Sequence, residues 1–342
     1  MAERLLEVDD LHVHFVTEDG VVRAVDGVSF DLERGKVLGI VGESGSGKSV
    51  TALTIMGLTR DVNSRFEGAV LYKGTDLLTV GEDEMQAYRG AEIGMIFQDP
   101  MTSLNPVYRI GEQIVEAIQA HEHVDKRSAK RRAVELLKQV GIPNPESRVD
   151  DFPHQFSGGM RQRAMIAIAL SCNPDILIAD EPTTALDVTI QAQIIELIDR
   201  LKDDFNSAVI MITHDLGVVA DVADDIVVMY GGRVVERATS RELFYDPQHP
   251  YTWGLLGSIP RLDRPRVDRL HSIKGAPPSL INLPQGCKFR PRCPHAFEKC
   301  MEEPRLEQRV EAPGHLDRCW LDVGTKRAVR DATISGGHTE AA

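Results

Sequence analysis

The sequence has no long apolar run and no excess of basic charge. No apolar stretch approaches the roughly 18 residues of a membrane-spanning helix, and residues 1–7 lack the basic start and apolar core of a signal peptide. We therefore expect a chain that neither spans a membrane nor is exported. With 52 acidic against 39 basic residues the formal charge is −13. Because no basic stripe is evident either, nucleic-acid binding is not expected.

Cysteine is also scarce, and its placement is uneven. Five cysteines are poor disulfide candidates in a reducing compartment. Four of them nevertheless form a C-x₅-C-x₆-C-x₁₈-C series among prolines that favour turns, namely Cys287, Cys293, Cys300 and Cys319. Four thiolates on a loop-rich segment suggest a metal ion or a cluster. Since the tight C-x₂-C pairs of most zinc ribbons are missing, a set of free thiols is the alternative.

The most informative stretch is residues 42–49, which fits the phosphate-binding pattern G-x-x-x-x-G-K-[ST]. It follows the apolar run at residues 37–41, so a buried strand is expected to lead into a glycine-rich loop and then into a helix starting near Lys48. Lys48 would reach the outer phosphates of a nucleotide, and the Ser49 hydroxyl would bind Mg²⁺. The pattern predicts a nucleotide polyphosphate site.

Three further apolar runs end in polar residues. They are residues 93–97 before Gln98, residues 176–179 before Asp180 and Glu181, and residues 208–212 before Thr213 and His214. Runs that are apolar throughout are typical of parallel strands covered on both faces, and a helical pattern at residues 188–202 separates the last two. Because the carboxyl ends of parallel strands share one edge of a sheet, we expect these side chains at one ligand-binding edge.

These polar residues have the chemistry that a nucleotide hydrolase needs. Asp180 would hold the metal ion and its waters. Glu181 could orient, or accept a proton from, a water that attacks the γ-phosphate, although taken alone it could equally be a solvated loop acid. Gln98 could contact Mg²⁺ or water, and His214 would point at the same edge. A lone histidine at a strand end is more often structural.

A second candidate anion site starts at Ser157. Ser157, Gly158 and Gly159 precede a helical pattern over residues 164–171, and Ser157 is placed to cap the N-terminus of that helix. By itself this arrangement is ordinary helix capping.

Taken in order, these motifs resemble the nucleotide-binding subunit of ATP-binding cassette (ABC) transporters. The family order is phosphate loop, glutamine loop, signature, Asp-Glu strand end, Ala-Leu-Asp loop and switch histidine, and the resemblance covers roughly residues 5–240. The matching residues are Gly42, Glu43, Ser44, Gly45, Ser46, Gly47, Lys48, Ser49 and Thr51, then Gln98, then Ser157, Gly158, Gly159 and Met160, then Asp180 and Glu181, then Ala185, Leu186 and Asp187, and finally His214. Met160 and Phe156 depart from the commonest signature.

The resemblance implies an α/β fold of the P-loop NTPase class. It would have a β-rich N-terminal subdomain, a RecA-like core and a helical subdomain at about residues 99–172, all within residues 1–240. It also implies that Phe15 stacks on adenine, although a half-buried strand residue is nearly as good an interpretation. Mg²⁺ would be bound by Ser49, Gln98 and Asp180, and the catalytic residues would be Glu181, His214 and Gln98. Each ATP would lie between the phosphate loop of one subunit and the signature of another, in a head-to-tail dimer.

Beyond residue 240 the composition changes to proline, arginine and cysteine. Residues 249–252 and 286–300 resemble the tail of dipeptide and oligopeptide importer ATPases, which nickel and glutathione importers share. The resemblance implies an irregular extension over residues 241–322 with a [4Fe-4S] cluster on the four cysteines, zinc being the alternative. Residues 323–342 have almost no bulky apolar side chains and are expected to be disordered.

These features predict the ATPase subunit of a peptide importer, peripheral to the cytoplasmic face of the membrane. It would pair with a second, related ATPase subunit and dock on two membrane-spanning permease subunits, with peptides delivered by an external binding protein. Nickel and glutathione are alternative solutes. Docking is expected near residues 98–109, with Met101 and Leu104 exposed.

Two other classes of function compete with transport. The first is a soluble cassette ATPase in iron–sulfur cluster assembly, DNA repair or translation. The chain has neither the long heptad helices of the repair proteins nor the second cassette of the translation factors. The second is a purely regulatory binding module, which Glu181 and His214 disfavour.

Overall fold

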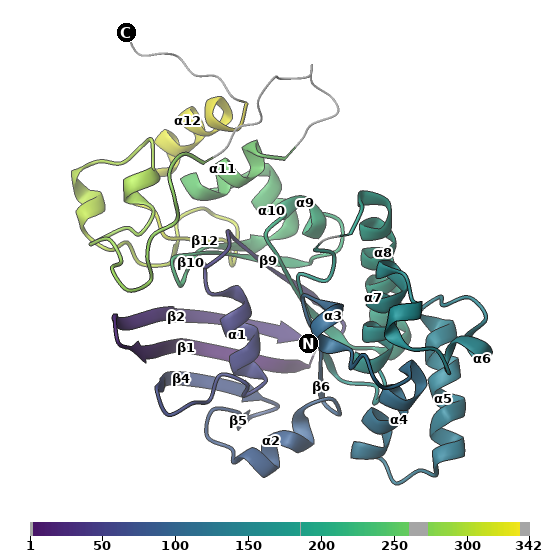
Figure 1. Ribbon diagram of the computed structural model, residues 1–342. Coiled ribbons are helices and arrows are strands. Elements are labelled where there is room, and N and C mark those ends of the chain that lie inside the picture. The colour runs from purple at the N-terminus through teal and green to yellow at the C-terminus, as the bar shows by residue number, and fades with distance from the viewer. Residues whose placement is uncertain (1–2, 185, 260–272, 336–342) are drawn as a thin grey trace. The chain divides into compact units, whose positions relative to one another are not determined.

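The computed structural model describes residues 3–184, 186–259 and 273–335 (Figure 1). The chain divides into two compact units, each assembled from three separate segments. The first unit comprises residues 1–6, 31–37 and 71–212, and the second comprises residues 7–30, 38–70 and 213–342. Among the described residues, no helix combines the length and the apolar content that crossing a bilayer requires.

The first unit contains three parallel strands, with β7 between β6 and β8. The strands are β6 (Ile93–Ile96), β7 (Ile176–Asp180) and β8 (Ala208–Thr213). In register, Ile178 of β7 lies opposite Met95 on one side and Ile210 on the other. Every residue of the three strands is buried, which confirms the prediction of apolar parallel strands covered on both faces.

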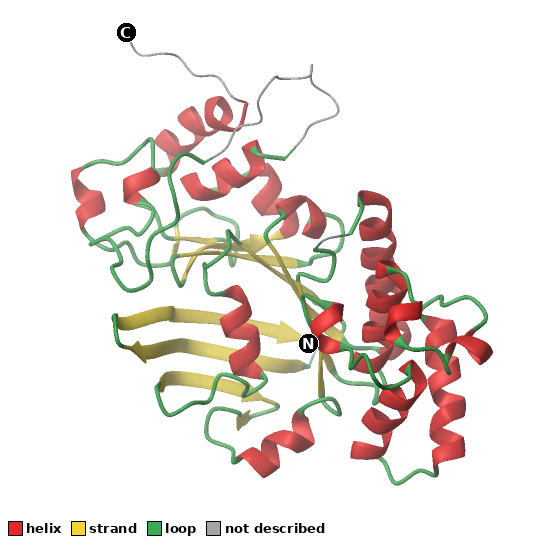
Figure 2. Ribbon diagram, viewed as in Figure 1, coloured by secondary structure: helices red, strands yellow, loops and turns green. Residues whose placement is uncertain are grey.

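Helices make up most of the rest of the first unit (Figure 2). The longer ones are α4 (Ile110–His121), α5 (Lys126–Gln139), α7 (Gly158–Ala169) and α8 (Val188–Phe205). The shorter elements are β5 (Thr75–Asp76), α2 (Glu82–Tyr88), α3 (Pro100–Ser103), α6 (Pro145–Arg148) and the 3₁₀ turn η1 (Pro153–Gln155). Helix α4 packs against α5 and α7.

The sequence pattern indicates one helical region over residues 110–141, but the structure divides it into α4 and α5. Asp125 lies at the break and caps α5, because its carboxylate accepts hydrogen bonds from the backbone N–H groups of Arg127 and Ser128 at 3.0 and 3.1 Å. The break lets the two helices turn back and pack against each other.

The second unit contains the phosphate loop and two groups of strands. Strands β1 (Arg4–Thr17), β2 (Gly20–Glu33) and β4 (Ser64–Tyr72) pair in the order β2-β1-β4. Strand β3 (Val37–Val41) runs parallel to β9 (Asp225–Tyr230), which forms an antiparallel hairpin with β10 (Arg233–Thr239). The hairpin predicted at Gly231 and Gly232 is therefore confirmed. Two short strands, β12 (Leu316–Asp317) and β11 (Glu307–Gln308), continue from β10.

Strands β1 and β2 are longer than the sequence pattern indicates. Period-two alternation marks only residues 11–15 and 28–32, whereas each strand has 14 residues. Burial along β1 is irregular outside the predicted stretch, with two adjacent exposed positions at Asp9 and Asp10. Asp10 has a positive φ of 44°, which interrupts the alternation. The prediction of a β-rich opening is confirmed.

The helices of the second unit are mostly short. They are α1 (Lys48–Ile55), α9 (Leu216–Val219), α10 (Ser240–Tyr245), α11 (Pro250–Gly257), the 3₁₀ turns η2 (Arg290–Arg292) and η3 (Glu298–Met301), and α12 (Val323–Ser335). The predicted disorder over residues 323–342 is wrong for α12, which packs against α11, while residues 336–342 lie outside the described residues. The Lys326 ammonium group contacts the Asp317 carboxylate at 2.7 Å, and both side chains are buried. The low content of bulky apolar residues did not predict this helix, because a buried ion pair helps to hold it in place.

Asp175 links two segments of the first unit, residues 31–37 and 71–212. Its carboxylate accepts hydrogen bonds from Arg34 at 2.6 Å and from the Tyr72 hydroxyl at 2.9 Å, and it also pairs with Lys73. Burial alone would raise the pKa of Asp175, but the hydrogen bonds from Arg34, Lys73 and Tyr72 outweigh it and hold that pKa well below the ordinary value.

We expect Asp175→Asn to lower the free energy of unfolding by about 2 kcal/mol at neutral pH, because it leaves a cationic pair partly uncompensated. A carboxylate with a lowered folded-state pKa stabilises the fold above its unfolded pKa, near 4. That stability is lost as the pH falls further, so the difference between the two proteins should shrink below about pH 4. Urea unfolding across this pH range measures the difference in the free energy of unfolding. Asp204→Asn, at an exposed position, is the matched control. Equal stability of the wild type and Asp175→Asn at pH 7 would contradict the assignment.

Candidate nucleotide-binding site

The phosphate loop follows β3 and ends at Gly47, the N-cap of α1. Gly47 has a φ of 102°, and a Cβ atom there would lie 2.4 Å from the Ala24 carbonyl oxygen. A Cβ atom on Gly42 would lie 2.3 Å from the Met229 carbonyl oxygen. Both positions therefore require glycine. The predicted order of strand, glycine-rich loop and helix is confirmed.

Lys48 is 4% exposed and turns back onto the loop. Its ammonium group donates to the carbonyl oxygens of Gly42 at 2.7 Å and Glu43 at 3.1 Å. A charged ammonium group held there is available to phosphate oxygens, which are stronger acceptors than these carbonyls. Ser49 follows at the second position of α1 and is half-buried.

Other loop residues have structural roles. The Ser46 carbonyl oxygen accepts from the Gly232 backbone N–H at 3.1 Å, which ties the loop to the β9–β10 turn. The Thr51 hydroxyl donates to the Gly47 carbonyl oxygen at 3.0 Å, and its side chain is fully buried. The predicted role of Thr51 at the nucleotide stays a prediction. Ser44 and Gly45 lie on the exposed part of the loop.

In the first unit, the structure brings Gln98 and Glu181 together from the ends of β6 and β7. The Gln98 side-chain amide donates to Glu181 Oε2 at 3.1 Å, and the Thr184 hydroxyl donates to the same oxygen at 2.9 Å. Glu181 has a positive φ of 47°, which is uncommon for a residue with a side chain and is found most often at functional sites. Asp180 is buried at the end of β7. The predicted convergence of strand ends is thus confirmed for Gln98 and Glu181.

Two other predicted contacts of the nucleotide lie in the second unit with the phosphate loop. Phe15 is half-buried near the end of β1, which leaves part of its ring accessible for stacking. His214 directly follows β8 and is exposed. Both roles remain predictions.

The signature segment begins a helix earlier than the sequence pattern indicates. Helix α7 starts at Gly158, and the Ser157 hydroxyl caps it by accepting from the Met160 backbone N–H at 3.3 Å. Ser157 and Gly158 are exposed, whereas a Cβ atom on Gly159 would lie 3.2 Å from the Ile190 side chain. A 12-residue helix therefore presents its N-terminus at the surface.

The Ala-Leu-Asp loop lies beside this helix start. A Cβ atom on Gly158 would meet the Leu186 side chain at 4.0 Å, and Asp187 caps α8 by accepting from the Ile190 backbone N–H at 3.0 Å. Ala185 lies outside the described residues. The structure thus places two of the predicted dimer motifs next to each other.

The predicted docking segment is partly confirmed. Met101 is 61% exposed, but Leu104 is only 2% exposed, so the expectation for Leu104 is wrong. Residues 100–103 form the short helix α3, and the Leu104 N–H donates to the Pro100 carbonyl oxygen at 3.1 Å, a turn that directs Leu104 inward. The exposed apolar side chains after α3 are Val107 and Tyr108.

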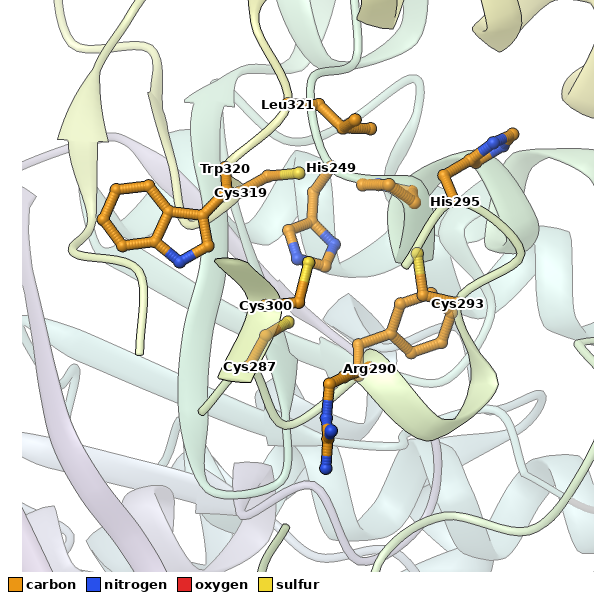
Figure 3. Close-up of a pocket in the computed structure, with 11 residues that line it drawn as sticks. His249, Cys287, Arg290, Cys293, His295, Cys300, Cys319, Trp320 and Leu321 are labelled. Atoms are coloured by element: carbon orange, nitrogen blue, oxygen red, sulfur yellow. The ribbon is translucent and has the colours of Figure 1, made fainter. Parts of the chain in front are cut away.

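The four C-terminal cysteines surround one small cavity (Figure 3). The cavity is lined by Cys287, Cys293, Cys300 and Cys319 together with His249, Pro250, Phe289, Arg290, His295, Trp320 and Leu321. Burial raises the pKa of Cys293 and of Cys319 to about 12, and the pKa of Cys287 is raised for the same reason. Such thiols lose their protons only to a strongly cationic centre, which fits a metal site.

The spacing of the sulfur atoms distinguishes two kinds of centre. A single tetrahedral zinc ion with Zn–S bonds of about 2.3 Å brings its sulfur ligands to about 3.8 Å from one another. Among the described residues, the one group of three or more His, Cys, Asp or Glu with ligand atoms all within 4.8 Å is His12, His14 and Asp26. The four cysteine side chains line one cavity without meeting that close spacing.

The His12, His14 and Asp26 group was not identified from the sequence. Asp26 accepts hydrogen bonds from Arg233 at 2.7 and 2.9 Å and lies 3.2 Å from His12 Nδ1. Burial favours the neutral acid, yet the Arg233 guanidinium outweighs it and lowers the pKa of Asp26. Because Arg233 already neutralises this carboxylate, we assign no metal ion to the group.

Comparison with known proteins agrees with this geometry. Two family models match, described as ABC transporter over residues 25–184 and as oligopeptide/dipeptide transporter, C-terminal region over residues 235–300. The oligopeptide transport ATP-binding protein OppD of Salmonella typhimurium is 52% identical over 322 residues, which cover 94% of this chain and 95% of that protein. The dipeptide transport ATP-binding protein DppD of Lactococcus lactis is 55% identical over 320 residues, which cover 93% of this chain and 91% of that protein.

Among solved structures, the dimeric post-hydrolysis state of the ATP-binding cassette MJ0796 bound to ADP and Pi is similar, with a TM-score of 0.62 and 27% identity. The match covers 69% of this chain and 99% of that cassette. The similarity thus extends through the phosphate loop, the strand ends and the cysteine-bearing segment. The chain belongs to the ABC transporter family, in the branch of the oligopeptide and dipeptide transport ATP-binding proteins.

Proposed function

We propose that this protein is the ATP-hydrolysing subunit of an ABC importer of dipeptides or oligopeptides. The observation that carries the proposal is that one chain matches both the cassette model and the oligopeptide/dipeptide C-terminal model. The names of its relatives, which are oligopeptide and dipeptide transport ATP-binding proteins, favour peptides over nickel or glutathione as the solute.

In this proposal, the phosphate loop binds the triphosphate of ATP. Lys48 exchanges its two carbonyl acceptors for phosphate oxygens, and Phe15 stacks on the adenine ring. Ser49, Gln98 and Asp180 hold the Mg²⁺ ion, which neutralises charge that develops on the phosphates. His214 senses the γ-phosphate.

Glu181 acts on the attacking water. Its Oε2 atom accepts hydrogen bonds from Gln98 and Thr184, which fixes the orientation of the carboxylate. A carboxylate held in this way can align a water molecule with the γ-phosphate and accept its proton. Gln98 links the metal site to this base, so the two strand ends act together.

A second subunit completes each site. The exposed N-terminus of α7, with Ser157, Gly158 and Gly159, is an anion-binding surface that meets the ATP held by the phosphate loop of a related ATPase subunit. The dimeric MJ0796 cassette with bound ADP and Pi supports this arrangement. Hydrolysis then weakens the attraction between the two subunits and lets them separate.

The pair of ATPase subunits binds two membrane-spanning permease subunits at the cytoplasmic face of the membrane. Met101, Val107 and Tyr108, exposed apolar residues around α3, supply the contact surface. Motion at the ATP sites is passed through this surface to the permease, which receives peptides from an external binding protein.

The four cysteines of the extension hold a [4Fe-4S] cluster. The proposal is supported by the position of all four side chains around one small cavity. When bound, the cluster supplies a cross-link between segments that are otherwise joined by loops, and its positive charge stabilises four thiolates in a buried site.

We expect Glu181→Gln to bind ATP and to accumulate as a closed dimer, with steady-state hydrolysis lowered at least 100-fold, because the neutral amide cannot accept the proton of the attacking water. Phosphate release by the assembled transporter and size-exclusion chromatography with MgATP measure the two effects. Glu196→Gln, an exposed substitution on α8, is the matched control and should be unaffected. Wild-type phosphate release from the Glu181 variant would remove that residue from the catalytic role.

Protein purified without oxygen should contain about four iron atoms and four sulfide ions per chain and absorb visible light. Cys293→Ser should lose most of the iron, whereas Cys172→Ser should retain it, because Cys172 lies in the other compact unit. Metal analysis, sulfide analysis and visible spectra of the three proteins decide the matter. Stoichiometric zinc without iron would show that the cluster assignment is wrong.

A further inference from the structure

Glu43 of the phosphate loop is held at two points by residues far along the chain. Its carboxylate receives a bidentate contact from Arg292, with distances of 2.5 Å from Nη1 to Oε2 and 3.0 Å from Nη2 to Oε1. Its backbone N–H donates to the Tyr251 hydroxyl at 2.8 Å. Arg292 is 249 positions away and Tyr251 is 208 positions away. All three residues belong to the same compact unit.

The Arg292 side chain is only 5% exposed, and every nitrogen of its guanidinium group is used. Besides Glu43, it donates to the carbonyl oxygens of Lys274 at 3.0 Å and Ile273 at 3.2 Å, and to the Tyr230 hydroxyl at 3.3 Å. Glu43 is the charged member of this set of acceptors. A buried guanidinium group needs such a counter-charge, and its planar fork fixes the carboxylate in one orientation.

The position of Arg292 depends on the cysteine-bearing turn. Arg292 is the last residue of η2, between Cys287 and Cys293, and its backbone N–H donates to the Phe289 carbonyl oxygen at 2.9 Å. The Phe289 ring packs against Tyr251 with ring centroids 5.4 Å apart. The same turn therefore supports both groups that hold Glu43.

Glu43 in turn affects the lysine that binds phosphate. The carbonyl oxygens of Gly42 and Glu43 are the acceptors for the Lys48 ammonium group. Movement of Glu43 would therefore move carbonyl oxygens that hold the Lys48 ammonium group. Ser44 and Gly45, which follow Glu43, are exposed, so the contacts of Glu43 contribute to how well this part of the loop is preorganised for the nucleotide.

We propose that Arg292 and Tyr251 are positioning residues for the phosphate loop, through which the cysteine-bearing turn sets the affinity of the protein for MgATP. The inference rests on the proposed nucleotide site but not on transport or on the identity of the metal centre. It gives the C-terminal extension a role in nucleotide binding, in addition to any role of its cysteines.

The test is a double-mutant cycle between Arg292 and Glu43. Binding of a non-hydrolysable MgATP analogue to the purified full-length protein is measured by calorimetry for Arg292→Met, Glu43→Gln and the double variant. Each single substitution should raise Kd about tenfold, and the double variant should be no weaker than the weaker single one, because the two residues act as one contact. The exchanged pair, Arg292→Glu with Glu43→Arg, should recover part of the affinity.

Arg305→Met is the matched control. Arg305 lies in the same C-terminal extension, and its side chain is exposed. This variant should bind the analogue like the wild type. Tyr251→Phe, which removes only the hydroxyl acceptor of the Glu43 N–H, should raise Kd by a smaller factor of about three. Thermal unfolding of each protein without nucleotide shows whether the fold is kept.

A merely structural role would not separate KM from kcat. In the assembled transporter, Arg292→Met should raise KM for ATP about tenfold and change kcat less than twofold, because Gln98 and Glu181 are untouched. Wild-type Kd for a folded Arg292→Met protein would overturn the proposal, as would an equal loss of affinity in Arg305→Met. Because binding is measured on the isolated chain, failure of the transport proposal would leave this result interpretable.

Discussion

The structure of the nucleotide site depends on close backbone packing around the phosphate loop. Gly42 and Gly47 lie so near the carbonyl oxygens of Met229 and Ala24 that a single methyl group would overlap with them. These carbonyls belong to β9 and β2, so two strands form the surface on which the loop lies. The start of α1 and the direction of Lys48 follow from that packing. The phosphate loop is therefore shaped largely by main-chain packing, and Lys48 and Ser49 add side chains to it.

Local sequence patterns predicted the elements of the fold that depend on interactions between neighbouring residues. Apolar runs gave β3, β6, β7 and β8, and the glycine pair gave the β9–β10 hairpin. The pairing of Gln98 with Glu181 also followed from sequence, because the ends of parallel strands share an edge. These predictions succeeded because period and turn chemistry are properties of a few adjacent residues.

The failures share a different cause, since they concern burial that the types of the neighbouring residues do not indicate. Leu104 was expected to be exposed because its neighbours are prolines and polar residues, yet the turn after α3 buries it. Helix α12 was expected to be disordered because it has little apolar surface, yet the buried pair of Lys326 and Asp317 anchors it. The sequence around Lys326 does not indicate that Asp317, 9 positions away, will be buried with it as its partner.

The extension illustrates how such buried charges can join a cysteine-rich segment to a cassette. Glu236 of β10 is fully buried and accepts hydrogen bonds from the backbone N–H groups of Gln248 and His249 and from His315. Burial lowers the pKa of His315, but the hydrogen bond and charge of Glu236 outweigh it, so that this pKa is raised. One carboxylate thus fixes the chain just before α11 and a loop more than 60 residues later in the sequence.

Glu236 and Glu43 have the same physical role at two ends of the extension, since each is a carboxylate that accepts hydrogen bonds from residues of that segment. An extension attached by apolar contacts alone could shift by small steps. Paired charges tolerate little displacement, because a buried ion that loses its partner is strongly destabilised. Because the attachment is by ion pairs, a displacement of the cysteine-bearing turn also displaces the phosphate loop. Apolar packing would allow the turn to move with a smaller effect on the loop.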